Sequence, residues 1–202
     1  ISFSSKCLYW CYACNYTSSI PGGQAQPSHY RACRLLRTNR SHHIYQAPVR
    51  ELANYFIREE THEDVTLDTE SLELTNFKGK SSSITLEIDV SNNPSKAGIE
   101  VMKNGRYGTK IYYDSTTGCV VFDRTACGSL LSGFRYAKVE PINGKIKLQI
   151  IQDVSSVEVF INDGYYTMTG NIFADAEYEN VSLIASGNAT FTNLKFNEIK
   201  VN

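Results

Sequence analysis

The sequence predicts an all-β protein, a sandwich of two antiparallel β-sheets, over residues 64–202. Apolar and polar residues alternate along short segments, as they do in strands that bury one face. Clusters of Asn, Asp, Gly and Pro separate these segments at short intervals, which is typical of an all-β sandwich. After residue 60 no segment has the apolar periodicity of a long helix.

The clearest strands lie in residues 145–164. Ile146, Leu148 and Ile150 alternate with polar residues, and the alternation resumes after a turn with Val157, Val159 and Ile161. The sequence Asn162-Asp163-Gly164 then supplies residues that tolerate positive φ, so we expect a further chain reversal there. Other predicted strands cover residues 83–90, 98–102, 109–113, 118–123, 165–169, 181–185 and 190–196.

Composition and charge exclude several functional classes. The chain has 202 residues, of which 42% are hydrophobic, enough for a substantial core. With 20 basic and 21 acidic residues the net charge is -1, and neither sign forms long blocks. We therefore expect neither a nucleic-acid partner nor a membrane surface. No apolar run approaches the roughly 18 residues of a membrane-spanning helix.

Cysteines and glycosylation sequons favour a secretory route for the parent protein, although no signal peptide is visible. Cys119 and Cys127 flank a short segment that could close as a hairpin, so they are candidates for a disulfide, with two buried thiols as the alternative. The candidate N-glycosylation sites are Asn15, Asn39, Asn180 and Asn188.

The first part of the chain differs from the rest. Residues 1–44 are rich in Cys, Tyr, Ser, Arg and His, and little regular structure is expected there. Pro48 stands where a first helical turn would begin, and apolar residues at helical spacing follow it. We therefore predict a short amphipathic helix of about three turns, in a connector that covers residues 45–63.

The cysteines and histidines do not form a metal or cofactor motif. Cys7, Cys11 and Cys14 have the spacing of a [4Fe–4S] site in radical enzymes, but Ala13 replaces the usual aromatic residue and the βα units of such enzymes are missing. Cys33 and the His42-His43 pair lack the paired short spacings of a zinc site. We predict neither a metal nor a cofactor.

Two segments resemble a known family. Residues 118–128, GCVVFDRTACG, and residues 143–164, NGKIKLQIIQDVSSVEVFINDG, closely resemble the C-terminal β-sandwich module of glycoside hydrolase family 32, the invertases, levanases and inulinases. Thr125 replaces the usual Ser and Val154 the usual Arg. Upstream, residues 43–52 look like the family's connector from its five-bladed propeller.

The resemblance implies a jelly-roll or concanavalin-like module whose partner is the catalytic propeller, with residues 1–44 as a degraded remnant of the last blade. Family 32 enzymes are retaining glycosidases that need two carboxylates roughly 5 Å apart. The family's Trp-Met-Asn-Asp-Pro-Asn, Arg-Asp-Pro and Glu-Cys motifs are all missing. We therefore expect no catalytic residue in this chain, which is interpreted as a fragment, a frameshifted copy or a complete gene product.

Related fructan-binding modules use this sandwich, and the resemblance therefore implies candidate sugar-binding residues. Directional hydrogen bonds would come from Asp123, Arg124, Asp153 and Glu158, and a stacking surface from Tyr112 or Tyr113. The alternative for Glu158 is an ion pair with Arg124. Besides a role in stabilising the propeller, a free-standing fructan-binding lectin and a protein-interaction sandwich, including a homo-oligomer, remain open.

Overall fold

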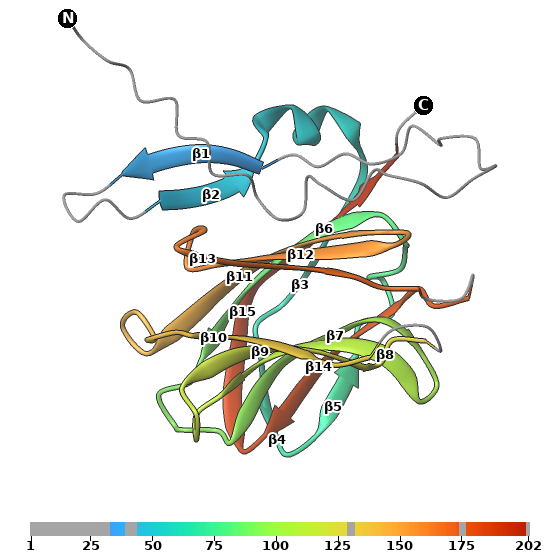
Figure 1. Ribbon diagram of the computed structural model, residues 1–202. Helices are drawn as coiled ribbons and strands as arrows, with labels where there is room; N and C mark the ends of the chain where they lie inside the picture. Colours follow the sequence, from blue (N-terminus) through green and yellow to red (C-terminus); the bar gives the residue numbers. More distant parts are fainter. Residues whose placement is uncertain (1–32, 39–43, 129–131, 174–176, 201–202) are drawn as a thin grey trace, which may run out of the picture. The chain divides into compact units, whose positions relative to one another are not determined.

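The computed structural model describes residues 33–38, 44–128, 132–173 and 177–200. Within them, two antiparallel sheets stack face to face as two layers (Figure 1). The predicted all-β sandwich is therefore confirmed. No helix among the described residues has the length and apolarity needed to cross a membrane.

One layer is a seven-stranded sheet. Its order is β13-β12-β11-β6-β15-β3, and β4 also pairs with β15. The long strand β15 has two partners on the same side. Its first half pairs with β4 and its second half pairs with β3. The strands are β3 (Phe56–His62), β4 (Val65–Asp68), β6 (Ser82–Asp89), β11 (Lys145–Asp153), β12 (Ser156–Ile161), β13 (Tyr166–Asn171) and β15 (Asn188–Ile199).

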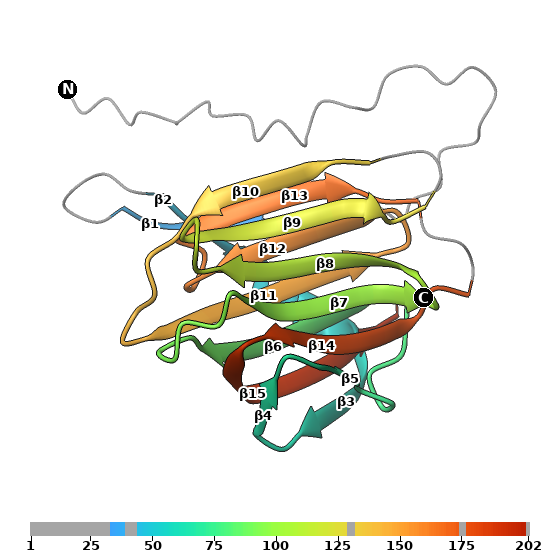
Figure 2. The ribbon, with the colours of Figure 1, turned by 90° about the horizontal axis from the view of Figure 1, so that it is seen from below.

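The other layer is a six-stranded sheet of order β10-β9-β8-β7-β14-β5, whose strands lie side by side in Figure 2. Its central strands follow one another as hairpins, so neighbours in sequence are neighbours in space. The strands are β5 (Ser71–Glu73), β7 (Lys96–Asn104), β8 (Tyr107–Asp114), β9 (Cys119–Ala126), β10 (Phe134–Lys138) and β14 (Asn180–Ser186).

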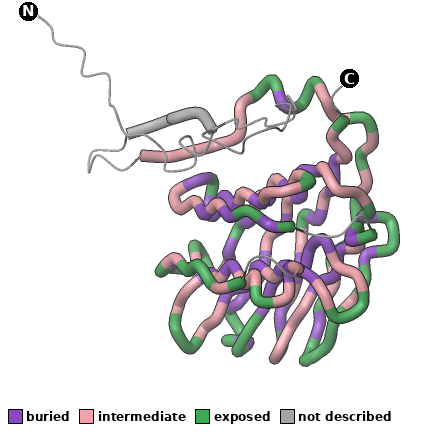
Figure 3. Tube along the Cα trace, turned by 45° about the vertical axis from the view of Figure 1, so that its right-hand side comes forward, coloured by how far each residue is buried: buried purple, intermediate pink, exposed green. Residues whose placement is uncertain are grey.

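The core lies between the two sheets, where Figure 3 shows buried residues recurring along the strands. Side chains on a strand point alternately to its two faces, so the alternation read from the sequence delivers one apolar row per strand to the core. The fully buried large side chains include Ile84, Leu86, Ile99, Ile111, Phe122, Ile146, Phe191 and Phe196.

The N-terminal part contains more regular structure than predicted. Strands β1 (Cys33–Thr38) and β2 (Ile44–Pro48) pair in antiparallel register, so the expectation of little regular structure up to residue 44 is wrong for residues 33–38. The rest of the predicted propeller-blade remnant, residues 1–32 and 39–43, lies outside the described residues.

The predicted amphipathic helix is also shorter than expected. A 3-10 helix, η1 (Arg50–Tyr55), follows Val49, and strand β3 begins directly at Phe56. β3 pairs with β15, so the seven-stranded sheet already starts within the residues assigned to a helical connector. Residues 50–55 form about two turns of 3-10 helix, but Phe56 and Ile57 belong to an edge strand.

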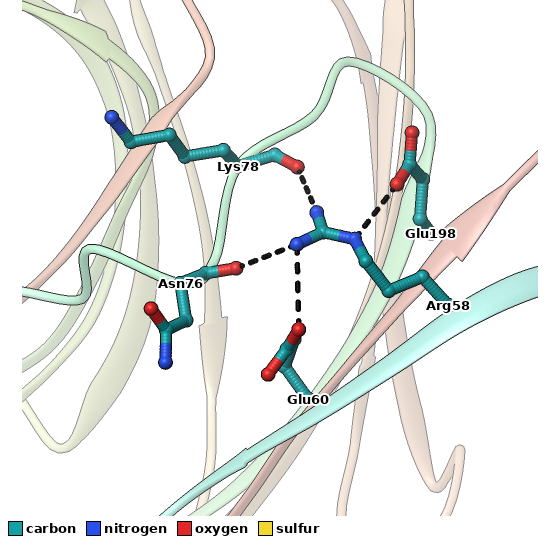
Figure 4. Close-up of polar contacts among 5 residues, drawn as sticks. All are labelled: Arg58, Glu60, Asn76, Lys78 and Glu198. Carbon is teal, nitrogen blue, oxygen red and sulfur yellow. Dashed lines mark hydrogen bonds and ion pairs between the residues drawn. The ribbon is translucent and has the colours of Figure 1, made fainter.

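Arg58 explains why these residues form a strand at the sheet edge (Figure 4). Its Nε donates to Glu198 Oε2 at 2.9 Å, and its two terminal nitrogens donate to the carbonyl oxygens of Asn76 and Lys78 at 3.2 and 2.7 Å. Glu60 Oε1 lies 3.5 Å from Nη1. The guanidinium fork thus ties β3, β15 and the 76–78 loop together, a geometry that a single lysine ammonium could not match.

The predicted disulfide is not formed, since both Cys119 and Cys127 are free thiols. They stand at the two ends of β9, and an extended strand of this length holds its ends roughly 25 Å apart, far beyond the reach of a disulfide. The segment between them is therefore one strand, not a hairpin. Burial raises the pKa of the Cys127 thiol, so it stays protonated at neutral pH.

Candidate functional site

The two candidate carboxylates Asp123 and Glu158 lie on opposite sides of the molecule. Phe122 faces the core from β9, so its neighbour Asp123 faces outward from the six-stranded sheet. Val157 and Val159 face the core from β12, so Glu158 faces outward from the seven-stranded sheet. Stacked sheets are about 10 Å apart, so these carboxylates cannot approach the roughly 5 Å separation of a retaining glycosidase pair.

Asp123 and Arg124 serve the local structure of the six-stranded sheet. Asp123 Oδ1 accepts bonds from the backbone N and the Oγ1 of Thr125, at 2.8 and 2.6 Å. Arg124 lies on the core side, where its guanidinium carbon is 5.9 Å from the centre of the Phe122 ring and Nη1 donates to the Asn171 carbonyl at 2.8 Å. Glu158 faces outward from the other sheet, so its predicted ion pair with Arg124 stays a prediction.

Asp153 closes the turn between β11 and β12. Its Oδ1 accepts hydrogen bonds from Ser81 Oγ and from the backbone N of Val154, both at 2.8 Å. Asp153 and Ser156 are register partners at the end of this hairpin. The carboxylate is thus engaged by the fold, and it shares the outer face of the seven-stranded sheet with Glu158, which pairs with Ile151 two residues earlier on β11.

Neither candidate tyrosine offers an open stacking surface. Tyr113 packs into the core between the sheets. Tyr112 faces outward but is only 8% exposed, and the Lys96 ammonium lies 5.1 Å from its ring centre. Burial raises the pKa of both phenols. The six candidates therefore form no common sugar site.

Of the predicted sequons, Asn180 begins β14 and Asn188 begins β15, whereas Asn15 and Asn39 lie outside the described residues. Asn188 is exposed and its Oδ1 accepts a bond from Asn92. Within the described part of the chain, no group of His, Cys, Asp and Glu side chains is placed to hold a metal ion.

The outer face of the seven-stranded sheet has a feature that the sequence analysis did not assign, a set of buried residues that point away from the core. Phe160 on β12 stands between the core residues Val159 and Ile161 and therefore points outward, yet it is only 3% exposed. Ser83 and Asn197 are register partners on the same outer face, and both are buried. We call this face, defined by Phe160, Ser83 and Asn197, the covered face.

Strand β2 lies against the covered face at β13. The backbone N of Gln46 donates to the Gly164 carbonyl at 3.0 Å, and the Gln46 side chain is hydrogen-bonded to Thr167 Oγ1. Thr167 is the register partner of Phe160, which places this contact beside the buried ring. The rings of Tyr45 and Tyr165 meet edge to face at 5.4 Å.

Gly164 makes the approach of β2 sterically feasible. Its φ of +80° favours glycine, and a Cβ atom here would lie 1.6 Å from the Gln46 carbonyl oxygen. No side chain fits at that distance. The Asn162-Asp163-Gly164 turn, predicted only as a chain reversal, is therefore also the point where the N-terminal segment touches the sandwich.

One sequence signal could have revealed the covered face. Val159, Phe160 and Ile161 are three consecutive large apolar residues, whereas a strand with one solvent-exposed face should alternate. A continuous apolar run indicates burial on both faces. Ser83 and Asn197 carried no such signal, because small or polar residues are ordinary on an outward face.

The fold defines the class of the chain as an antiparallel β-sandwich module with one covered outer face. The family model described as "Glycosyl hydrolases family 32 C terminal" matches residues 51–198. The chain therefore belongs to the C-terminal modules of glycosyl hydrolase family 32, as the two motifs predicted.

Curated relatives and solved structures agree. The chain is 28% identical over 189 residues to the levanase of Bacillus subtilis (strain 168), which covers 89% of this chain and 28% of the levanase. It is 30% identical over 159 residues to a sucrose-6-phosphate hydrolase of Zymomonas mobilis, covering 75% of this chain and 31% of that protein. The chain thus spans a minor part of each of these relatives.

Among solved structures, the exo-inulinase of Aspergillus awamori has the same fold over 83% of this chain and 34% of its own, with a TM-score of 0.68 and 21% identity. The fructosyltransferase of A. japonicus matches 79% of this chain and 29% of its own, with a TM-score of 0.70 and 20% identity.

Proposed function

We propose that this chain is the non-catalytic β-sandwich part of a β-fructosidase, and that it packs on and stabilises a catalytic β-propeller. One observation carries the proposal: an outward-facing ring, Phe160, is buried where the segment that leads into the sandwich lies against it. An outer face that buries a large aromatic ring is the property expected of a module that works beside a second domain.

The chemistry of the described carboxylates supports a non-catalytic role. Asp123 and Glu158 face opposite sides, and Asp153 is held by the turn that it closes. Glu100 is a buried carboxyl whose pKa is raised by burial, a property that general acids share. Its ion-pair partner is Lys110 at 3.9 Å, however, and the Asp123 carboxylate on the same outer face is the smallest of the causes that shift its pKa, after burial and two lysines.

The proposed parent activity is hydrolysis of terminal β-fructofuranosides such as sucrose, levan or inulin. The names of the relatives, levanase, exo-inulinase and sucrose-6-phosphate hydrolase, support this substrate class. Export of the parent protein and glycosylation at the sequons remain predictions of the sequence alone.

The test is an assay of fructose release from sucrose, levan and inulin. The 202-residue chain should release none. A longer product that adds an in-frame propeller should release fructose. It should lose stability on Phe160→Asp but not on Tyr136→Asp, because the Tyr136 ring is exposed on the outer face of the six-stranded sheet. Fructose release by the 202-residue chain itself would overturn the proposal.

A further inference from the structure

A hollow of about 380 Å³ opens at one end of the seven-stranded sheet, away from every residue that the sequence analysis connected with sugar binding. Its size lies within the roughly 300–1,000 Å³ typical of small-molecule sites. It is formed where the ends of β6, β11 and β12 meet two turns. The lining residues are Glu87, Ile142, Asn143, Lys145, Lys147, Asn162 and Asp163.

Two rigid turns frame the hollow. Ile142 and Lys145 exchange backbone hydrogen bonds of 2.9 and 3.0 Å across the Asn143-Gly144 turn. On the other side, the buried Asn162 accepts the backbone N–H of Lys147 at 3.0 Å and donates to the Glu140 carbonyl at 3.3 Å. Preorganised walls lower the cost of ordering a site when a ligand binds.

The charges in the hollow balance. Lys147 Nζ lies 2.6 Å from Asp163 Oδ1, and Lys145 Nζ lies 3.7 Å from Glu87 Oε2. Two ammonium groups and two carboxylates therefore present donors and acceptors side by side without net charge. A phosphate or another anion would meet as much repulsion as attraction, whereas a neutral ligand with several hydroxyl groups can both donate to the carboxylates and accept from the lysines.

The rim also offers one apolar surface. Ile142 is a large apolar side chain that is 60% exposed at the start of the Asn143-Gly144 turn. Sugar rings carry C–H groups on one face and hydroxyl groups at the edge, so an exposed aliphatic side chain beside paired charges suits both parts of such a ligand.

We propose that this hollow is a binding site for a neutral polyhydroxylated ligand, specifically a fructosyl unit of an oligosaccharide or polysaccharide. Asp163 and Glu87 accept hydrogen bonds from its hydroxyl groups, Lys147 and Lys145 donate to them, and Ile142 contacts its C–H face. The polyol class follows from the lining of the hollow alone. The choice of a fructosyl unit rests on the proposed function.

The experiment is an NMR titration of the full chain with fructose, short inulin oligosaccharides, glucose and inorganic phosphate. Amide shifts should appear at Gly144, Lys147 and Asp163 with the inulin oligosaccharides. Asp163→Asn should weaken binding roughly tenfold, the effect of losing one charge-assisted hydrogen bond. The variant keeps the fold, because Asn tolerates the positive φ at this position.

Matched variants separate the outcomes. Lys147→Met, which keeps the aliphatic stem, should weaken binding similarly, while Asp123→Asn on the opposite sheet should leave it unchanged. Shifts with phosphate but not with the oligosaccharides, shifts centred on Asp123, or no shifts with any sugar would each overturn this site. Equal shifts with glucose would retain the polyol site and remove the fructosyl assignment. The proposed function has a separate readout, because it is overturned by fructose release from the 202-residue chain and not by the outcome of this titration.

Discussion

The outer faces of the two sheets differ at the aromatic residues near one sheet edge. On the seven-stranded sheet the outward ring of Phe160 is 3% exposed, whereas on the six-stranded sheet the outward ring of Tyr136 on β10 is 74% exposed. Tyr136 stands on the edge strand β10, and Phe160 stands on β12, next to the edge strand β13. Strand pairing alone therefore does not decide burial: β2 lies beside Phe160, and this second layer turns one face of the sandwich into a contact surface.

Truncating each of the two rings should give the largest difference in stability between the two faces. Phe160→Ala is expected to lower the free energy of unfolding by about 3–5 kcal/mol, the cost of a cavity at a buried aromatic residue. Tyr136→Ala should change it by no more than about 0.5 kcal/mol, because an exposed side chain loses little packing. Denaturant unfolding of both variants measures the difference, and equal losses would show that the two faces are alike.

The contact of β2 with the covered face can be tested at Gly164. Gly164→Ala should cost about 2–4 kcal/mol, because backbone strain at positive φ adds to the collision with the Gln46 carbonyl. Gly105→Ala is the matched control, since Gly105 also has positive φ but no atom within 4 Å of the added Cβ. It should cost only the strain, about 1–2 kcal/mol. Similar thermal unfolding of the two variants would argue against a close approach of β2.

The outer face of the six-stranded sheet contains a buried carboxyl group, Glu100, which should make the stability of the protein depend on pH. Burial raises the pKa of this carboxyl above its ordinary 4.5, and Lys110 offsets only part of the effect. The folded protein therefore holds the proton more tightly than the unfolded chain, and stability is lost as pH rises from 4.5 through the raised pKa. Glu100→Gln should remove this loss, so the variant gains on the wild type as pH rises. A pH-independent difference between them would contradict this account.

The smallest effect is expected at Cys119, at the edge of the same face. Cys119→Ser should change the free energy of unfolding by no more than about 0.5 kcal/mol, because the thiol makes only a long contact with the Thr117 carbonyl. A loss of about 2–4 kcal/mol would instead indicate a disulfide with Cys127. Urea unfolding with and without reductant distinguishes these results.

Most of the sandwich could be predicted because its central strands bury one face, so apolar and polar residues alternate along their sequence. Edge strands leave a weaker pattern: β10 places Arg135 and Ala137 opposite core residues, so it was missed. β3 is rich in charged residues, and its edge is held by the long-range bonds of Arg58, which no local pattern shows.

The sites were less predictable than the fold. Asp123 and Arg124 are adjacent in sequence, but alternation along β9 sends them to opposite faces, so shared motif membership did not imply a shared site. The hollow joins residues from three distant segments, which only the register of β6, β11 and β12 brings together.

Hydrogen exchange at the Gln46 amide tests the covered face most directly, because this N–H donates to the Gly164 carbonyl at 3.0 Å and so joins β2 to the sandwich. We predict protection close to that of the β12 and β13 amides in the wild type, and its loss in Gly164→Ala but not in Gly105→Ala. Exchange in the wild type as fast as in an exposed turn would contradict a docked β2, and with it the use of this face for packing.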